Sequence, residues 1–230
     1  MKYIYVITLL AVCLYFYIDI KKYDVSEYKY ESGLPYIKAK FNTGYRGEHL
    51  SFEKLESLEG HHRTLVNVYV PKDDNGTTEI DLVYIHETGI YVIESKNYSG
   101  WIFGSEKNKT WRQTFKTGRK EQFYNPIWQN NTHIKYLSQF LSNLDIKLFR
   151  SIIVFSERCT LRNIEVYSEN VKVINRYDLI STMKDIIGRS EKIFTEDRVN
   201  EIYYRLKALT NVSETVKLKH IEKIKERINQ

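Results

Sequence analysis

Two apolar stretches that have the character of neighbouring strands decide the fold. They are Glu79-Ile80-Asp81-Leu82-Val83-Tyr84-Ile85 and Gly89-Ile90-Tyr91-Val92-Ile93-Glu94-Ser95-Lys96. Both are rich in β-branched and aromatic residues, as expected for strands that are covered on both faces. The residues between them, from His86 to Gly89, supply a turn. The two stretches therefore predict a hairpin inside a buried sheet.

Each predicted strand carries charged residues within its apolar run. Because side chains alternate across a strand, Glu94 and Lys96 lie on the same face. We expect the tight turn to pair Ile85 with Ile90. In that register Asp81 stands directly opposite Glu94, with Cβ atoms about 4.5–5.5 Å apart. The sequence thus predicts two converging carboxylates with an ammonium group beside them.

Two carboxylates in a partly dry site repel one another, and an unpaired buried charge is unfavourable. A divalent cation removes this objection, because carboxylate oxygens are the ligands that Mg²⁺ and Mn²⁺ prefer. Lys96 would then lie near the metal and could orient a water molecule or stabilise charge on a phosphate. The pattern indicates phosphodiester hydrolysis. The alternative is that the three charged side chains form an internal salt bridge or lie in water near the strand ends.

The rest of the chain contains further helical and strand patterns. They predict a helix from Gly47 to near Gly60, a strand at Thr64–Val70, a hairpin of Trp101–Gly104 and Thr110–Phe115, a helix opening at Asn125-Pro126, strands at Leu148–Phe155 and Val171–Ile174, and helices beginning near Asp178, Thr195 and Ser213. The order of helix, three strands, helix and strand is that of a mixed α/β sheet core.

Two of the predicted helices carry polar residues of interest. Glu48 shares a helix face with Phe52 and Leu55 and so points inward, although an acid in a first turn can instead complement the helix dipole. Gln129 and His133 share a second face of their helix, which either lines a cleft or is solvated.

Several spaced motifs stand together in this order: Gly47-Glu48, Asn67–Pro71, Gly76–Asp81, Gly89–Gly100, and Asn125-Pro126 with Gln129 and His133. Over residues 42–155 the chain resembles the nuclease-related domain, NERD, of the PD-(D/E)xK nuclease superfamily. The resemblance implies a restriction-endonuclease-like αβββαβ core and a Mg²⁺ or Mn²⁺ cofactor. It also implies the site residues: Asp81, Glu94 and Glu48 as metal ligands, Lys96 as the catalytic lysine, Gln129 as a polar helix residue near the site, and His133 where related enzymes carry a tyrosine.

The N-terminal stretch Tyr3–Ile18 contains no charged residue. As a helix it would reach roughly 24 Å, against a hydrocarbon core of about 30 Å, and flanking lysines and tyrosines would help it span. We expect residues 1–22 to form an uncleaved membrane anchor; a signal peptide and a buried core helix are the alternatives. Lys21 and Lys22 against the single Lys2 predict that the domain faces the cytoplasm.

Composition and domain order add further expectations. Residues 23–43 predict a tether, residues 44–156 the nuclease-like core, and residues 157–230 a C-terminal strand and helical extension. Two cysteines exclude a disulfide framework and favour a reducing compartment. A net charge of +6 favours an anionic partner such as nucleic acid or a phospholipid surface.

The predicted hairpin combines basic and aromatic side chains. Its candidate phosphate contacts are Lys107, Lys109, Arg112, Arg119 and Lys120, while Trp101, Phe103, Trp111 and Phe115 could either stack on bases or pack in a core. His133, on the helix that follows, is a further candidate contact to nucleic acid. The C-terminal stretch is a basic amphipathic helix. We expect a membrane-anchored nuclease acting on DNA, with RNA as the alternative substrate. A non-catalytic nucleic-acid-binding or membrane adaptor module on the same fold is the competing interpretation.

Overall fold

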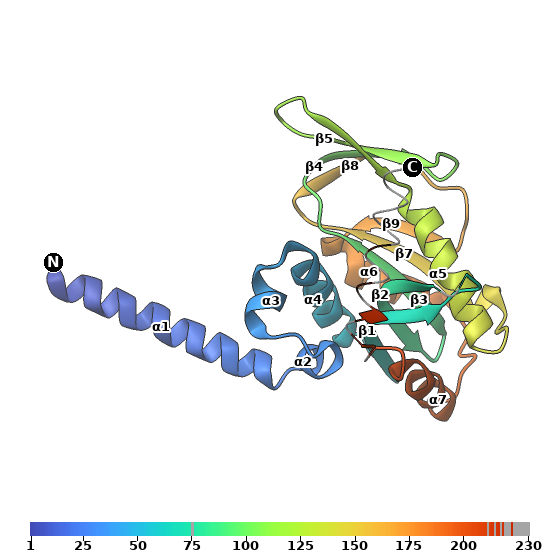
Figure 1. Ribbon diagram of the computed structural model, residues 1–230, viewed down its shortest axis with the longest axis horizontal. Coiled ribbons are helices and arrows are strands. Elements are labelled where there is room, and N and C mark those ends of the chain that lie inside the picture. Colours follow the sequence, from blue (N-terminus) through green and yellow to red (C-terminus); the bar gives the residue numbers. More distant parts are fainter. Residues whose placement is uncertain (75, 211, 214, 217, 219–221, 223–230) are drawn as a thin grey trace.

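A central five-stranded sheet organises the computed structural model, which describes residues 1–230 except 75, 211, 214, 217, 219–221 and 223–230 (Figure 1). Its strand order is β1-β2-β3-β7-β9. The strands are β1 (His62–Pro71), β2 (Thr77–His86), β3 (Gly89–Lys96), β7 (Phe149–Phe155) and β9 (Val171–Asn175). Strand β2 pairs antiparallel with both β1 and β3, whereas β7 pairs in parallel with β3 and with β9. The predicted mixed α/β sheet is therefore confirmed.

The predicted hairpin register is also confirmed. Ile85 lies opposite Ile90, and the pairing of β2 with β3 continues as far as Leu82 and Ile93. Parallel β7 pairs with the whole of β3, as far as Lys96. Strand β3 therefore stays inside the sheet at the point where β2 stops pairing with it.

Helices cover both faces of this sheet (Figure 1). On one face, α4 (Thr43–Glu56) and α6 (Leu179–Arg189) share a core with side chains such as Leu82 and Tyr91. On the other face, α5 (Pro126–Phe140) and α7 (Glu196–Lys207) share a core with Val83 and Val92. Asparagine side chains cap the first turns of both α4 and α5. Helix α5 begins at the predicted Asn125-Pro126 pair, whereas α4 begins at Thr43, earlier than the predicted Gly47, because Asn42 caps it.

A second, four-stranded sheet in the order β6-β5-β4-β8 lies beside the first (Figure 1). Its strands are β4 (Gly100–Ser105), β5 (Thr110–Thr114), β6 (Lys120–Tyr124) and β8 (Cys159–Glu165). The predicted hairpin forms β4 and β5, whereas the sequence had not indicated β6 or β8. Trp111 is buried, stacks on Phe155 and donates its indole N–H to the Ser105 carbonyl at 3.0 Å. This indole belongs to the core between the sheets.

The N-terminal helix α1 (Lys2–Asp24) extends away from the domain (Figure 1). It is long and apolar enough to cross a membrane, and its apolar window is not buried against the rest of the chain. The segment expected to be a tether instead holds two short helices, α2 (Glu27–Ser32) and α3 (Tyr36–Phe41). The aromatic rings of Tyr23 and Tyr28 are buried with the α4 side of the core, which holds these short helices against the domain.

Two single 3₁₀ turns complete the described chain. They are η1 (Ile146–Leu148), before β7, and η2 (Arg176–Asp178), between β9 and α6. The basic residues of the predicted C-terminal helix, Lys217, Lys219, Lys223, Lys225 and Arg227, lie outside the described residues.

Candidate active site

The candidate site lies where the regular pairing around β2 breaks down. On the β1 side, the pairs pass from Val66–Leu82 directly to Val68–Ile80 and leave out Asn67 and Asp81. Asn67 has a φ of 51°, in the left-handed region that asparagine tolerates better than most residues. This local distortion frees Asp81 from the ladder on both sides.

The Asp81 carboxylate takes up the hydrogen bond that the strand ladder would have made. Its Oδ2 accepts from the backbone N–H of Ser95 at 2.8 Å. Asp81 is therefore bound to the end of β3 at Ser95, the residue that lies between Glu94 and Lys96. The sequence predicted Asp81 directly opposite Glu94, but the β2–β3 ladder ends one pair earlier, at Leu82 and Ile93, and Asp81 instead bonds through its side chain to Ser95.

Lys96 joins β3 to helix α5. Its Nζ donates to Glu94 Oε1 at 2.5 Å and to Gln129 Oε1 at 3.1 Å. An ammonium group has three N–H bonds, so one remains for a ligand. The Lys96 side chain is partly exposed, while Glu94 is fully enclosed. The ammonium group is thus fixed by two acceptors, and its third N–H has no acceptor among the described hydrogen bonds.

His133 holds the second oxygen of the same carboxylate. Its Nε2 lies 3.2 Å from Glu94 Oε2, and its Nδ1 lies 2.8 Å from the Thr78 hydroxyl. Both ring nitrogens therefore have partners, and the imidazole is buried. The structure places His133 inside the site as a support for Glu94, rather than on a surface where the sequence allowed it to contact nucleic acid.

Glu48 supplies an uncompensated buried carboxylate from α4. The residue is 8% exposed, and its Oε2 has no hydrogen-bond partner within the described chain. Burial raises the pKa of Glu48, and the negative charges of Asp81, Glu79 and Glu94 raise it further. Its helix turns it inward, as the face it shares with Phe52 and Leu55 predicted.

The pKa values of the other charged groups of the site shift in different directions. Burial raises the pKa of Asp81 and the nearby Glu94 charge adds to this effect. Burial also raises the pKa of Glu94, but Lys96 and His133 outweigh it, so the pKa lies below its usual value. Burial lowers the pKa of Lys96, whereas Glu94 and Asp81 raise it to a net value above normal. These two carboxylates therefore favour the protonated, ammonium form of Lys96.

These carboxylates have the chemistry of a hard-cation site in an open arrangement. Among the described residues, no three His, Cys, Asp or Glu side chains are grouped closely enough to hold a metal ion. Glu48 Oε2 nevertheless has no partner in the described chain, and burial with the neighbouring acids raises the pKa values of Glu48 and Asp81, so the metal-free site disfavours their charged forms. A divalent cation fits this set of oxygen donors, provided that the carboxylates close around it.

Comparison with known proteins finds a family match over the segment that contains the candidate site. The NERD family, described as the nuclease-related domain, matches residues 43–156. An uncharacterized protein of Bacillus anthracis is 33% identical over 180 residues, which cover 78% of this chain and 82% of that protein. This chain belongs to the NERD family. No solved structure matches it. The NERD segment contains Glu48, Asp81, Glu94, Lys96, Gln129 and His133.

The predicted phosphate contacts of the NERD chain lie apart from the carboxylates, on the second sheet. Lys107, Lys109, Arg112, Arg119 and Lys120 are all exposed there. Some are already engaged, since Arg119 pairs with Glu121 and Lys107 lies over the Tyr167 ring at 4.2 Å. No contact links these side chains to Lys96 among the described hydrogen bonds and ion pairs.

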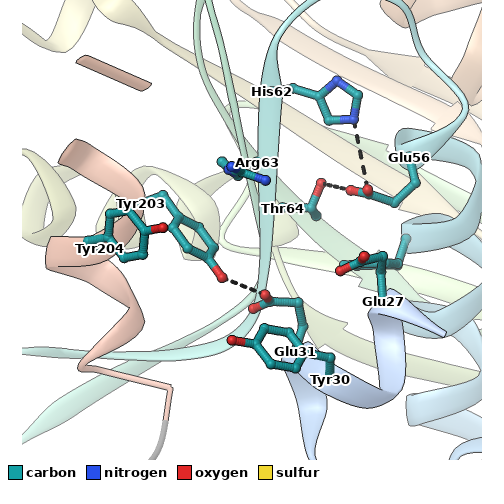
Figure 2. A pocket seen from close by; sticks show the side chains of 10 residues that line it. Glu27, Tyr30, Glu31, Glu56, His62, Arg63, Thr64, Tyr203 and Tyr204 are labelled. Atoms are coloured by element: carbon teal, nitrogen blue, oxygen red, sulfur yellow. Dashed lines mark hydrogen bonds and ion pairs between the residues drawn. The ribbon is translucent and has the colours of Figure 1, made fainter. Parts of the chain in front are cut away.

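A cavity of about 270 Å³ opens elsewhere on the NERD chain, between α2, α7 and the start of β1 (Figure 2). Glu31 and Glu56, two of the acidic side chains that line it, have partners within the protein. Glu31 accepts from the Tyr203 hydroxyl at 2.7 Å, and Glu56 accepts from the Thr64 hydroxyl at 2.5 Å (Figure 2). The cavity contains none of the predicted site residues, and its contacts join the N-terminal helices to the domain.

Sequence reasoning missed one charged residue close to the NERD site. Arg176 in η2 is almost fully buried and reaches Ser51 of α4, where its Nε donates to the hydroxyl at 3.1 Å. Gly47 makes room for this approach, because a Cβ there would lie 3.3 Å from Arg176 Nη2 and 3.2 Å from Ser95 Oγ. No local pattern around Arg176 indicated this contact, which joins segments far apart in the sequence.

Proposed function

We propose that this chain is a metal-dependent nuclease that hydrolyses phosphodiester bonds of DNA, with RNA as the second candidate. The observation that supports it most strongly is the Lys96 ammonium group, fixed by Glu94 and Gln129 with one N–H left over, near Asp81 and the buried, unpartnered oxygen of Glu48. A purely structural salt bridge would satisfy Lys96 and leave no orphaned acid nearby. Membership of the nuclease-related family points to the same chemistry.

In this proposal Lys96 acts on the scissile phosphate. Its free N–H donates to a non-bridging oxygen and stabilises the negative charge that develops as the bond breaks. Gln129 accepts from Lys96 through its carbonyl oxygen, which leaves its amide N–H groups able to donate to the same phosphate. Both groups are fixed before the substrate arrives, and preorganised donors contribute most to electrostatic catalysis.

Glu94, His133 and Thr78 act as positioning residues in the proposal. Thr78 holds the imidazole, the imidazole holds one oxygen of Glu94, and the other oxygen holds Lys96. Three separate elements, β2, α5 and β3, thus fix the direction of a single ammonium group. A small displacement of any of them would move the donor away from the phosphate.

Glu48, Asp81 and Glu94 are the residues that would hold Mg²⁺ or Mn²⁺. The chemistry that such an ion supplies when bound is Lewis-acid polarisation of the phosphate and activation of water. Binding would also satisfy the buried Glu48 oxygen, which has no other partner in the described chain.

The proposal includes a location. Helix α1 would lie in a membrane, and Lys21 and Lys22 at its C-terminal end would keep the domain in the cytoplasm. A protease added to intact and to permeabilised cells checks this orientation. Digestion of the domain in intact cells would contradict it.

Cleavage of labelled DNA and RNA by the full chain tests the activity. With Mg²⁺ or Mn²⁺, we expect cleavage that stops in a chelator and falls by about 10²–10³-fold in Lys96→Gln, as for loss of one donor to a reacting oxyanion. The cleavage rate of Asp81→Asn should fall by a similar factor, while Glu59→Gln, a change at an exposed residue, should keep the wild-type rate. Nucleic-acid binding without cleavage in any of these ions would instead favour the non-catalytic module.

A further inference from the structure

A basic pocket of about 220 Å³ lies at the start of α4, next to the candidate active site. It is lined by Phe41, Thr43, Arg46, Leu50, Asn97, Glu157, Arg158 and Arg176. Three arginines therefore face a single acidic side chain. Such an excess of guanidinium groups in a concave site is suited to an anion.

Arg176 forms the buried floor of this pocket. The residue is 1% exposed, and its Nη1 donates to Glu157 at 2.8 Å. Its Nη2 is buried and has no hydrogen-bond partner within the described part of the chain. Buried guanidinium nitrogens are normally paired, so an unpaired one that lines a cavity indicates a missing acceptor.

The other two arginines form the outer wall. Arg158 is oriented by Asn97, since its Nη2 donates to the Asn97 carbonyl at 2.6 Å and to the side-chain oxygen at 3.1 Å. Among the described residues, neither Arg46 nor Arg158 forms an ion pair with a carboxylate. Burial lowers the pKa of Arg176, Glu157 raises it, and the charges of Arg158 and Arg46 lower it further. The pocket thus has a positive charge that the protein itself does not balance.

The pocket adjoins the candidate site through two elements. On α4, Gly47 separates Arg46 from Glu48, and on β3 Asn97 follows Lys96 directly. The absence of a side chain at Gly47 lets Arg176 approach this junction. The pocket residues Arg46 and Asn97 are thus close neighbours along the chain of Glu48 and Lys96.

We propose that this arginine pocket binds a second phosphate group of the nucleic-acid strand, beside the one that is cleaved. The inference rests on the proposed nuclease function and adds a substrate-positioning site to it. Guanidinium groups match phosphate oxygens with paired hydrogen bonds, and Phe41 at the rim, 65% exposed, offers a ring on which a base can stack. The phosphate can be internal to the strand or can be its terminal monophosphate.

Fluorescence anisotropy with the full chain in chelator tests the inference without any cleavage. The probes are one single-stranded DNA oligonucleotide bearing a 5′-phosphate, a 3′-phosphate or no terminal phosphate. We expect Arg46→Gln combined with Arg158→Gln to weaken binding by about tenfold and to lower the salt dependence by about one to two phosphate contacts. A preference for one terminal phosphate, lost in the double variant, identifies the terminal source; equal losses for all three probes identify an internal phosphate.

The matched control is Arg189→Gln, because Arg189 is an exposed arginine paired with Asp185 on α6. It should leave affinity and salt dependence as in the wild type. An unchanged affinity in the double variant would overturn the inference, even if the wild type cleaves. The inference would also be overturned if the double variant lost affinity for anionic lipid vesicles but not for the oligonucleotides, because the pocket would then bind a lipid headgroup. Failure of the nuclease proposal is recorded separately, as nucleic-acid binding without cleavage in Mg²⁺ or Mn²⁺.

Discussion

Replacing Glu48 with glutamine should stabilise the metal-free protein. Glu48 Oε2 is buried without a partner, and three neighbouring carboxylates raise its pKa together with burial. Glutamine keeps the shape of the side chain and removes the charge. Each unit by which a pKa is shifted corresponds to about 1.4 kcal/mol, so we expect removal of this buried, repelled charge to raise the free energy of unfolding by about 1–3 kcal/mol. For a chain of this size this corresponds to a Tm increase of about 2–12 °C.

The effect of Glu48→Gln should depend on pH in a fixed direction. Because the pKa of Glu48 is higher in the folded chain than in the unfolded chain, its penalty is absent below the unfolded value of about 4.3. The penalty grows as the pH rises, until the folded group ionises. The Tm advantage of the variant should therefore be small at pH 4 and larger at pH 8.

Thermal unfolding in chelator and in Mg²⁺, followed by circular dichroism, measures these effects. Mg²⁺ should raise the Tm of the wild type by mass action and should raise that of Glu48→Gln much less. Glu59→Gln, an exposed change just beyond the same helix, should shift the free energy of unfolding by less than about 0.5 kcal/mol. A Glu48→Gln chain that is less stable at pH 8 in chelator, or that gains as much from Mg²⁺ as the wild type, would refute the reasoning.

Three further changes test the supports of the site. Gln129→Leu removes one of the two acceptors of Lys96, so kcat should fall by about tenfold with little change in Tm; an unchanged kcat would show that Gln129 does not position the ammonium group. His133→Phe leaves two buried polar groups without their partner and should lower the free energy of unfolding by about 1–3 kcal/mol in denaturant titration, whereas a neutral result would contradict the hydrogen-bond assignment. Gly47→Ala gains about 1 kcal/mol in helix propensity but forces contacts at 3.2 Å, so chemical denaturation should show a net loss; Gly188→Ala, with nothing within 4 Å, should show a gain.

Long apolar strands and their turn were predictable because they leave strong local signals. The run Ile80–Ile85, the run Ile90–Ile93 and the tight turn fix the register, and the structure has that register. Strands β6 and β8 left no such signal, since most of their residues are exposed or only partly buried and hydrogen bonding to β5 and β4 defines them. Helices α2 and α3 have six residues each, too few for a helical period to be visible.

Local sequence also explains part of the candidate site. The inward direction of Glu48 and the shared helix face of Gln129 and His133 follow from helical spacing. Spacing could not show that the imidazole bonds to Thr78, because this contact joins β2 to α5 across the fold. Arg176 was missed for the same reason, since it comes from a 3₁₀ turn far along the chain.

The contacts between α1 and the following segment bear on how far the domain can lie from a membrane. Asp19, near the end of α1, binds Lys40 at 2.7 Å and accepts from the Tyr36 hydroxyl at 2.6 Å, so two contacts brace the helix against the following segment. With α1 in a bilayer, a braced junction fixes the height and tilt of the domain above the lipid surface. Such an enzyme would act only on strands that pass within a shallow layer beside the membrane, and proximity would then select its targets.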